Sequence, residues 1–201
     1  ATWGGYTTQE VTPVGSVYKI STPQELAWFS CYVTNNQSIA KYYNAELTQS
    51  IDMKIDGEKK LFIPIAAGGG GNKYEGTFDG KGFTISNLFI QGSQIKQVTN
   101  GAQNIGFVGV LSGKGKITHL TLENVEILAA VSAGSNGLSG NPVSVGSFVG
   151  WQEGGTLENC VASGTIISSG DKNRVGGISG NVKTATITNC VSSVSITATG
   201  Y

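Results

Sequence analysis

Short apolar stretches of about four to six residues recur along the chain from residue 45 onward, and Gly and Asn residues separate them. Within a stretch, Ile, Val and Thr alternate with polar residues, which is the pattern of a half-buried β-strand. No stretch after residue 37 shows the spacing of a helix. The pattern therefore predicts a protein that is almost entirely β over this part of the chain.

The stretches form an internal repeat. Four segments, 84–88, 117–120, 156–160 and 186–190, align on their last residues, which lie 32, 40 and 30 positions apart. The aligned residues are Leu88, Leu120, Cys160 and Cys190. A glycine-rich element precedes three of them, and its Val108, Phe148 and Ile178 each lie twelve residues before the aligned Leu or Cys. A constant offset with variable spacers indicates a true repeat.

A unit of about 30 residues made only of strands cannot bury its apolar face alone, but stacked units can. We therefore expect a right-handed parallel β-helix, or β-solenoid, in which equivalent residues of successive coils lie ~4.8 Å apart. An antiparallel sandwich also has regularly spaced strands, but it does not explain why Asn-Cys recurs at one place in two units. The expected coils are 45–90, and the expected repeats are 104–127, 144–167 and 174–196.

The beginning of the chain has a different pattern. Thr22-Pro-Gln-Glu25 is a capping box with Pro at the first helical position. Leu26, Phe29 and Val33 then follow at helical spacing, and Asn35-Asn36 is a typical helix end. This predicts a helix over 23–34 that covers the open end of the solenoid. Residues 1–16 are expected to be an extension, and 17–201 a single β-helix domain.

Two tight turns are expected, at Asp56-Gly57 and at Asp79-Gly80-Lys81-Gly82. The last residues, 195–201, lie at the end of a unit and show no cap of the kind found at 23–34. The native protein is therefore expected to continue, with this chain as part of a longer one.

Charge excludes several classes of partner. Thirteen basic residues balance thirteen acidic residues, and Arg174 is the single arginine. Such a chain has no basic stripe for nucleic acid or anionic lipid. No apolar run reaches the ~18 residues of a membrane span. Low charge with many Thr, Ser, Asn and Gly residues favours an exported, extracellular protein.

The repeats resemble the GLUG-motif family of bacterial surface proteins. The resemblance rests on Gly-Phe-Val-Gly109, Gly-Ser-Phe-Val-Gly150 and Gly-Gly-Ile-Ser-Gly180, each followed by a strand that ends in Asn-Cys or its equivalent, and on Tyr74-Glu-Gly-Thr-Phe-Asp-Gly80 before them. It covers roughly residues 17–196. It implies an exported β-helical module of an adhesin, or a non-catalytic region of an immunoglobulin-A-specific metallopeptidase, at the cell surface.

The sequence predicts no catalytic residue, no metal site and no cofactor. His119 is the single histidine, and we expect it to be a bend residue. Polysaccharide hydrolysis requires two carboxylates across the scissile bond. The candidate pairs are Asp52 with Asp56, which flank a turn, and Glu123 with Glu126, which a strand would point to opposite faces. A carbohydrate-active enzyme therefore remains the second alternative.

Cys160 and Cys190 are expected on neighbouring coils. A Cα spacing of ~4.8 Å permits a disulfide, but parallel side chains keep the Cβ atoms farther apart than the usual ~3.8 Å. We therefore expect free, buried thiols. Cys31 is expected to pack within the helix.

Four residues are candidates for ligand binding. Trp151 and Tyr74 are expected to be exposed aromatic residues that can stack on a sugar ring or anchor a protein. Asn136 and Asn141 lie in the longest insertion, 129–143, and long loops on rigid scaffolds often carry function. The predicted function is that of an adhesin module that binds glycan or protein, and the first alternative is a spacer that displays another domain.

Overall fold

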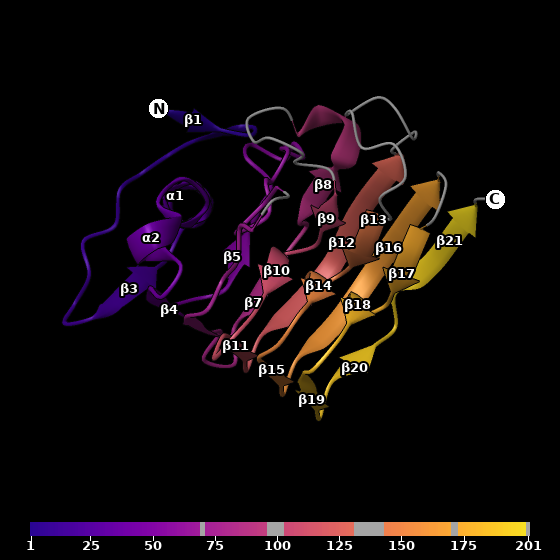
Figure 1. Cartoon of the computed structure of the whole chain (residues 1–201). Coiled ribbons are helices and arrows are strands. Elements are labelled where there is room, and N and C mark those ends of the chain that lie inside the picture. The colour runs from indigo at the N-terminus through magenta and orange to yellow at the C-terminus, as the bar shows by residue number, and fades with distance from the viewer. Residues whose placement is uncertain (69–70, 96–102, 131–142, 170–172, 200–201) are drawn as a thin grey trace.

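The computed structural model describes residues 1–68, 71–95, 103–130, 143–169 and 173–199. In these ranges the chain forms parallel sheets stacked in register, with two short helices near the N-terminus (Figure 1). All pairs of named strands are parallel except β1 (Thr2–Trp3) with β2 (Tyr6–Thr7). This arrangement is consistent with the expected β-solenoid and excludes the antiparallel sandwich.

One face of the stack is a six-stranded sheet in the order β19-β15-β11-β6-β4-β3. Its strands are β3 (Val17–Ile20), β4 (Asn44–Leu47), β6 (Thr77–Asp79), β11 (Lys116–Thr118), β15 (Thr156–Glu158) and β19 (Thr186–Thr188). The middle residue of each later strand points inward, so Phe78, Ile117 and Leu157 form one fully buried row. The alternation of apolar and polar residues sets which face is buried.

A second face is a seven-stranded sheet. Its main path joins β5 (Ile51–Asp52), β7 (Thr84–Ser86), β12 (Thr121–Ala130), β16 (Val161–Ser169) and β20 (Val191–Ser192). β8 (Phe89–Gln91), which precedes the 3₁₀ turn Gly92–Gln94, pairs with β12, and β21 (Ser195–Thr199) pairs with β16. Ile90, Ile127, Ile166 and Ile196 lie in one register row, as stacked coils require.

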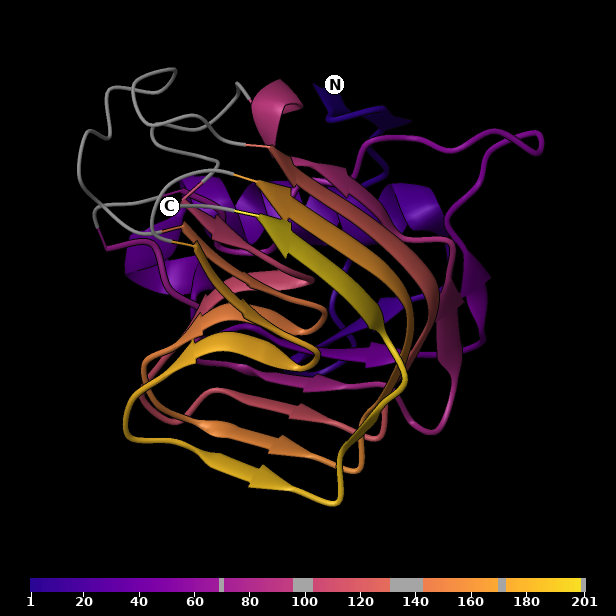
Figure 2. The same ribbon diagram turned by 90° about the vertical axis from the view of Figure 1, so that its right-hand side faces the viewer.

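The remaining strands form two three-stranded ladders. One contains β10 (Val108–Leu111), β14 (Val149–Gln152) and β18 (Ser179–Val182). The other contains β9 (Asn104–Ile105), β13 (Val143–Gly146) and β17 (Asn173–Gly176). In the view along the stack, these two ladders fold back on each other on one side of the coils (Figure 2).

Helix α1 (Pro23–Asn35) confirms the helix predicted over 23–34 and extends it by one residue. Thr22 caps it by accepting a hydrogen bond from the Glu25 N–H at 3.2 Å, and the Glu25 carboxylate accepts from the Ser21 N–H at 2.7 Å. Leu26, Phe29 and Val33 are fully buried in the common core. The short helix α2 (Gln37–Ala40) follows directly.

The first residues also pack against this core. Trp3 and Tyr6 are buried, and the Trp3 Nε1–H donates to Ser30 Oγ of α1 at 3.1 Å. The Tyr6 hydroxyl donates to the Met53 carbonyl at 2.8 Å. Residues 1–7 therefore join the helix to the first coils.

The bends between strands use residues that tolerate positive φ. The turns at Asp56-Gly57 and Lys81-Gly82 are confirmed, with φ of 52° and 77° in the first and 54° and 84° in the second. At one bend of the later coils, His119, Asn159 and Asn189 have φ between 50° and 53°. Asparagine reaches this left-handed region more readily than most residues, which explains its recurrence.

The sequence alignment of the first unit was wrong in two respects. The segment 84–88 does not pair with 117–120, because β7 pairs with residues 121–123 of β12, and β6 pairs with β11. Val108 pairs with Val149 rather than with Phe148. The first error arises because short alternating strands on different faces look alike, and the second is a shift of one residue within one ladder. The predicted matches of Leu157 with Ile187 and of Glu158 with Thr188 are correct.

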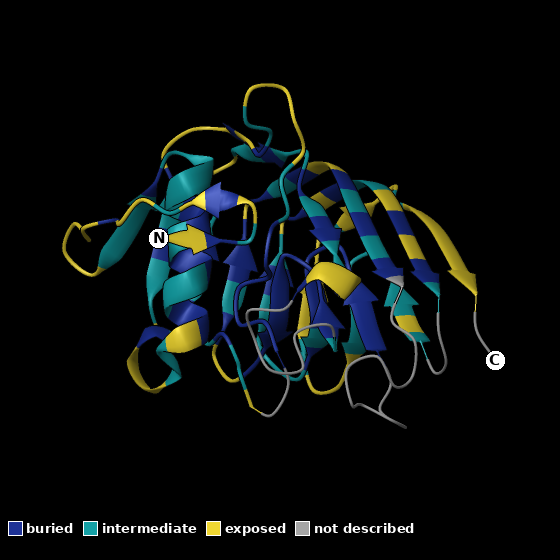
Figure 3. Cartoon of the chain, turned by 90° about the horizontal axis from the view of Figure 1, so that it is seen from above, coloured by how far each residue is buried: buried dark blue, intermediate teal, exposed yellow. Residues whose placement is uncertain are grey.

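Burial falls sharply in the last described coil (Figure 3). Ile187 is 42% exposed, whereas its register partner Leu157 is fully buried. Ile196 is likewise 42% exposed, whereas its partner Ile166 is fully buried. These side chains point toward the solenoid interior, and in the described part of the chain no further coil covers them.

Candidate functional site

The glycine-rich motif brings two ladders into direct backbone contact. A Cβ on Gly150, in β14, would lie 2.5 Å from the Ile105 nitrogen of the preceding coil. One on Gly106, between β9 and β10, would lie 2.8 Å from the Gly146 carbonyl oxygen of the following coil. In the next coil, a Cβ on Gly180 would lie 2.6 Å from the Val145 carbonyl oxygen. Real Cβ atoms essentially never approach other atoms so closely. The repeated glycines are therefore required for the two ladders to fold against each other.

A groove of about 190 Å³ lies where these ladders meet. It is lined by Gln103, Asn104, Ser144, Trp151, Arg174 and Asn181. Asn104, Ser144 and Arg174 form one register row across β9, β13 and β17. Trp151 and Asn181 belong to the row across β14 and β18. The groove is thus built from equivalent positions of successive coils.

Trp151 is the predicted candidate that the structure places in this groove. It lies within β14, with Val110 of the preceding coil and Asn181 of the following coil as its register partners. The equivalence with Asn181 was expected from the repeat, but Trp151 lies in a strand and not at a bend. Its side chain is only partly buried. Trp151 is therefore partly accessible to solvent, and it lines the groove together with the polar residues.

The polar residues of the groove differ in how far they are exposed to solvent. Asn104 and Ser144 are 6% and 3% exposed, and Asn104 Nδ2 donates to the Gly68 carbonyl at 3.5 Å. Arg174 is exposed and makes no ion pair with any acidic residue in the described ranges. The sequence analysis missed these residues as a site. Their equivalence within the repeat was a usable signal, but the contact between the two ladders was not visible in the sequence.

The expected exposure of Tyr74 is wrong. Its side chain is fully buried, and its hydroxyl donates to the Tyr43 carbonyl at 2.8 Å. Burial raises the pKa of this phenol well above its usual value. The ring packs edge-on against Phe29 of α1, so it offers no face to a ligand from solvent. Tyr74 lies in the apolar core because it pairs with Leu111 and so extends the β10 ladder by one chain segment.

The other two candidates, Asn136 and Asn141, lie outside the described residues, as does most of the insertion 129–143.

Two larger cavities contain the carboxylates considered for catalysis. The first, about 390 Å³, is lined by both Asp52 and Asp56, with Lys54 between them in sequence. Hydrogen bonds from Asn87 Nδ2 at 2.9 Å and from the Lys54 N–H at 3.0 Å hold the pKa of Asp52 below its usual value. A glycosidase acid needs a raised pKa. Asp52 is therefore unsuited to that role.

The second cavity, about 340 Å³, includes Glu126 and Lys59. Glu126 Oε2 forms an ion pair with Lys59 Nζ at 2.7 Å. Glu123 does not line this cavity. Among the residues that the structure describes, no aromatic ring lines either of the two larger cavities.

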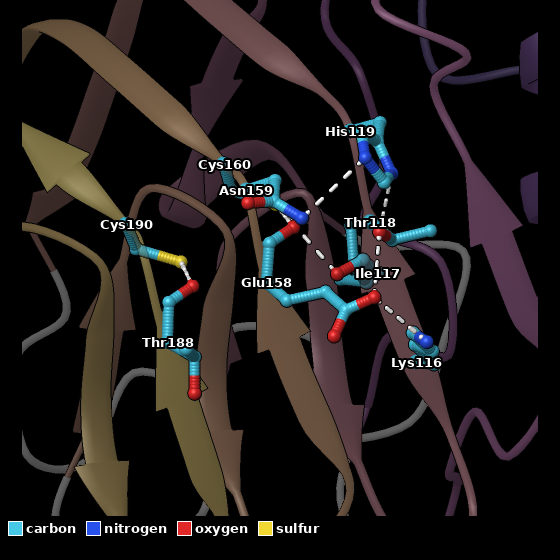
Figure 4. Close-up of polar contacts among 9 residues, drawn as sticks. All are labelled: Lys116, Ile117, Thr118, His119, Glu158, Asn159, Cys160, Thr188 and Cys190. Atoms are coloured by element: carbon cyan, nitrogen blue, oxygen red, sulfur yellow. Dashed lines mark hydrogen bonds and ion pairs between the residues drawn. The ribbon is translucent and has the colours of Figure 1, made fainter.

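His119 is a bend residue, as predicted, and takes part in a polar ladder across two coils (Figure 4). Its Nδ1 is 2.8 Å from Thr118 Oγ1, which donates to Glu158 Oε1 at 3.1 Å. Lys116 Nζ lies 2.7 Å from the same carboxylate oxygen, and this ion pair lowers the pKa of Glu158. These side chains satisfy one another along the surface of the sheet. In the described part of the chain, no group of three or more His, Cys, Asp or Glu side chains is placed to hold a metal ion.

The three cysteines are free, as expected. Cys160 is buried, and Cys190 of the next coil is partly exposed; their thiols donate to the carbonyls of Glu158 at 3.3 Å and Thr188 at 3.4 Å (Figure 4). Burial raises the pKa of Cys160 to about 12.

Comparison with known proteins places the glycine-rich bend in a family. Residues 141–167, which include β13, β14 and β15, match the model for the GLUG motif. The chain carries a GLUG motif. This confirms the resemblance for residues 141–167, and Gly146 and Gly150 within them are positions where a Cβ would meet backbone atoms at 2.3 Å and 2.5 Å.

One similar protein is halomucin of Haloquadratum walsbyi, which is 32% identical over 138 residues. The match covers 66% of this chain but only 1% of halomucin, so the chain spans a very small part of the curated relative it matches. No solved structure matches significantly. Among the described helices, none is long and apolar enough to cross a membrane.

Proposed function

We propose that this chain is a β-solenoid module of an extracellular surface protein and that it binds a glycan or protein ligand at the groove beside Trp151. The observation that carries the proposal is the groove itself, in which a partly exposed indole adjoins amide, hydroxyl and guanidinium groups. Aromatic faces with polar neighbours are typical of sites that recognise sugars and proteins. The family resemblance to exported adhesin modules supports the same function.

The winding of the coils agrees with this assignment. Seen from the C-terminal end, the yellow coil in Figure 2 runs anticlockwise toward the viewer, which supports a right-handed parallel β-helix. The groove would then lie on the side of a stiff rod, where a ligand approaches without hindrance from the neighbouring coils. In this proposal the rod presents the site and the repeats keep it rigid.

The groove is proposed to bind without catalysis. The described residues that line it include no Asp or Glu, and glycoside hydrolysis requires a pair of carboxylates. Incubation with a panel of polysaccharides, followed by assays for reducing ends and unsaturated products, tests this directly. If either product is released, and its release is lost when Asp52 or Asp56 is substituted, the chain is an enzyme and the binding-module proposal fails.

A panel of immobilised glycans and extracellular-matrix proteins tests the binding function. We expect a reproducible ligand whose affinity falls at least about tenfold in Trp151→Ala, because truncation of a central aromatic anchor commonly costs 2 kcal/mol or more. Val182→Ala serves as a control, because Val182 is also an exposed apolar residue but does not line the groove. A ligand that binds both variants equally well would show that its binding site lies elsewhere on the chain.

A spacer is the second candidate, and the match to 1% of a much longer protein favours it. A spacer predicts no specific ligand on a broad panel and no effect of Trp151→Ala. The chain is then one segment of a longer surface protein whose binding domain lies elsewhere.

A further inference from the structure

Arg174 differs from the other basic side chains of this protein. It is the single arginine of the chain, whereas twelve of the thirteen basic residues are lysines. Seven of these lysines form ion pairs with carboxylates. Arg174 makes none with the described acidic residues, although it is exposed on β17. Its guanidinium therefore keeps its full set of donors for a group from solution.

The backbone fixes Arg174 beside Trp151. Arg174 is the register partner of Ser144, and a Cβ on Gly180 would lie 2.8 Å from the Arg174 carbonyl oxygen. Gly180 immediately precedes Asn181, which is the register partner of Trp151. Both side chains line the same groove. A cation and an indole thus share a site whose described lining residues include no carboxylate to neutralise the charge.

The shape of the groove limits the size of its ligand. Pockets for drug-sized molecules have volumes of roughly 300–1,000 Å³, and this groove has about 190 Å³. One sugar ring, with its neighbours extending into solvent, suits that volume better than a buried oligosaccharide. The indole would cover the apolar face of the ring, while Asn181 and Gln103 offer amide groups to its hydroxyls.

We propose that the ligand of this groove is an acidic glycan and that Arg174 binds the carboxylate of a uronic acid ring stacked on Trp151. This proposal rests on the proposed binding function and specifies its ligand class. A guanidinium presents its donors in a planar fork that matches a carboxylate with two parallel hydrogen bonds. A neutral sugar would leave Arg174 without a role, whereas an acidic ring uses the cation, the indole and the amides together.

The test compares acidic and neutral forms of the same ligand. The whole chain is titrated by calorimetry with trimers of galacturonate, glucuronate and mannuronate, and with the carboxyl-reduced form of each. We expect at least one acidic trimer to bind about tenfold or more tightly than its reduced form, because a hydrogen bond to a charged group contributes enough for that ratio. Arg174→Gln should abolish the preference, and Arg174→Lys should keep only part of it.

Lys114→Gln is the matched control. Lys114 is exposed, lies outside the groove and forms no ion pair with the described acidic residues. Its replacement by Gln changes the net charge by the same amount as Arg174→Gln. We expect it to leave the preference intact at 150 mM salt, where remote charges are screened. Trp151→Ala should weaken binding of the acidic and reduced trimers alike. Unfolding curves for each variant establish that the fold is retained.

The outcomes separate the two proposals. If reduced and acidic trimers bind equally and Arg174→Gln changes neither, the acidic-glycan proposal fails, while a loss in Trp151→Ala would still support the binding function. If no glycan or protein on the panel binds, both fail. A sulfated trimer that binds as tightly as the uronates, or a glutamate-rich peptide that binds more tightly, would overturn the assignment to a carboxylated sugar.

Discussion

Gly150 shows how one residue determines the shape of the groove. A methyl group there would lie 2.5 Å from the Ile105 nitrogen and 2.9 Å from the Ser144 carbonyl oxygen, and both atoms belong to backbone that cannot move aside alone. We expect Gly150→Ala to lower the free energy of unfolding by about 1–3 kcal/mol, as over-packing does elsewhere. Urea denaturation measures the loss.

Gly154→Ala is the control for this substitution, because a Cβ on Gly154 would lie 3.1 Å from the Gly113 nitrogen and 3.6 Å from the Gly113 carbonyl oxygen. It should lower the free energy of unfolding clearly less than Gly150→Ala does. Equal stability of Gly150→Ala and the parent chain would mean that the two ladders are farther apart than the structure places them.

Cys160 provides a second test at the scale of one side chain. Burial raises the pKa of its thiol to about 12, so the thiol stays protonated at pH 8 and is both shielded and unreactive. In the double variant Cys31→Ser/Cys190→Ser, we expect slow labelling by a disulfide reagent in the native state and fast labelling in urea. The variant that retains only Cys190, which is partly exposed, should label faster.

Because the pKa of Cys160 is raised in the folded state, the free energy of unfolding depends on pH. The unfolded thiol titrates near its usual value of 9.0, below its folded value. Its contribution to stability is therefore complete below pH 9 and is lost as the pH rises toward 12. Labelling of native Cys160 as fast as that of the unfolded chain at pH 8 would contradict its burial.

At the scale of elements, the N-terminal helix depends on its cap. Thr22 Oγ1 accepts the Glu25 N–H, which otherwise has no partner within the helix. We expect Thr22→Ala to lower the free energy of unfolding by about 1 kcal/mol, measured by urea denaturation. Thr22→Ser keeps the acceptor and should lie close to the parent chain. Because α1 packs into the common core through Phe29, unfolding should remain a single transition.

The sequence predicted this helix nearly to the residue because its signals are local: a cap, a Pro at the first position and a helical apolar face. Register between coils is different, since it depends on partners about 30 to 40 residues away. The repeats with Asn-Cys aligned correctly, but 84–88 was assigned to the wrong face. Its Thr-Ile-Ser pattern resembles that of β11, and only the pairing of β7 with β12 distinguishes the two.

The candidate site was predictable in part for the same reason. Trp151 stood out because the repeat places Asn181 at the equivalent position. Arg174 did not, because its proximity to Trp151 arises only when the two ladders fold back at the glycine-rich bend. Tyr74 was misplaced because an aromatic residue beside a glycine run carries no sequence signal that separates a core position from a surface one.

At the scale of the whole molecule, each coil contacts mainly its neighbours, so stability is distributed along the stack. Inner coils are covered on both sides: Leu122 and Ile127 of β12 are fully buried. The last described coil is covered on one side, and the inward-facing Ile196 of β21 is 42% exposed. Opening of that coil should therefore require less free energy than global unfolding.

Hydrogen exchange of the native chain tests this gradient. We expect backbone amides of β20 and β21 to exchange fastest among the parallel strands, β16 to be intermediate, and β12 to exchange only with global unfolding, because each outward step removes one covering neighbour. Ile196→Ala should increase exchange in β21 while leaving β12 unchanged, since Ile196 pairs with Ile166 of β16, and β16 lies between β21 and β12. Measurement at two protein concentrations provides the control: protection of β20 and β21 that rises with concentration would identify a second copy seated on the open coil. Protection equal to that of β12 at all concentrations would contradict a stack stabilised coil by coil.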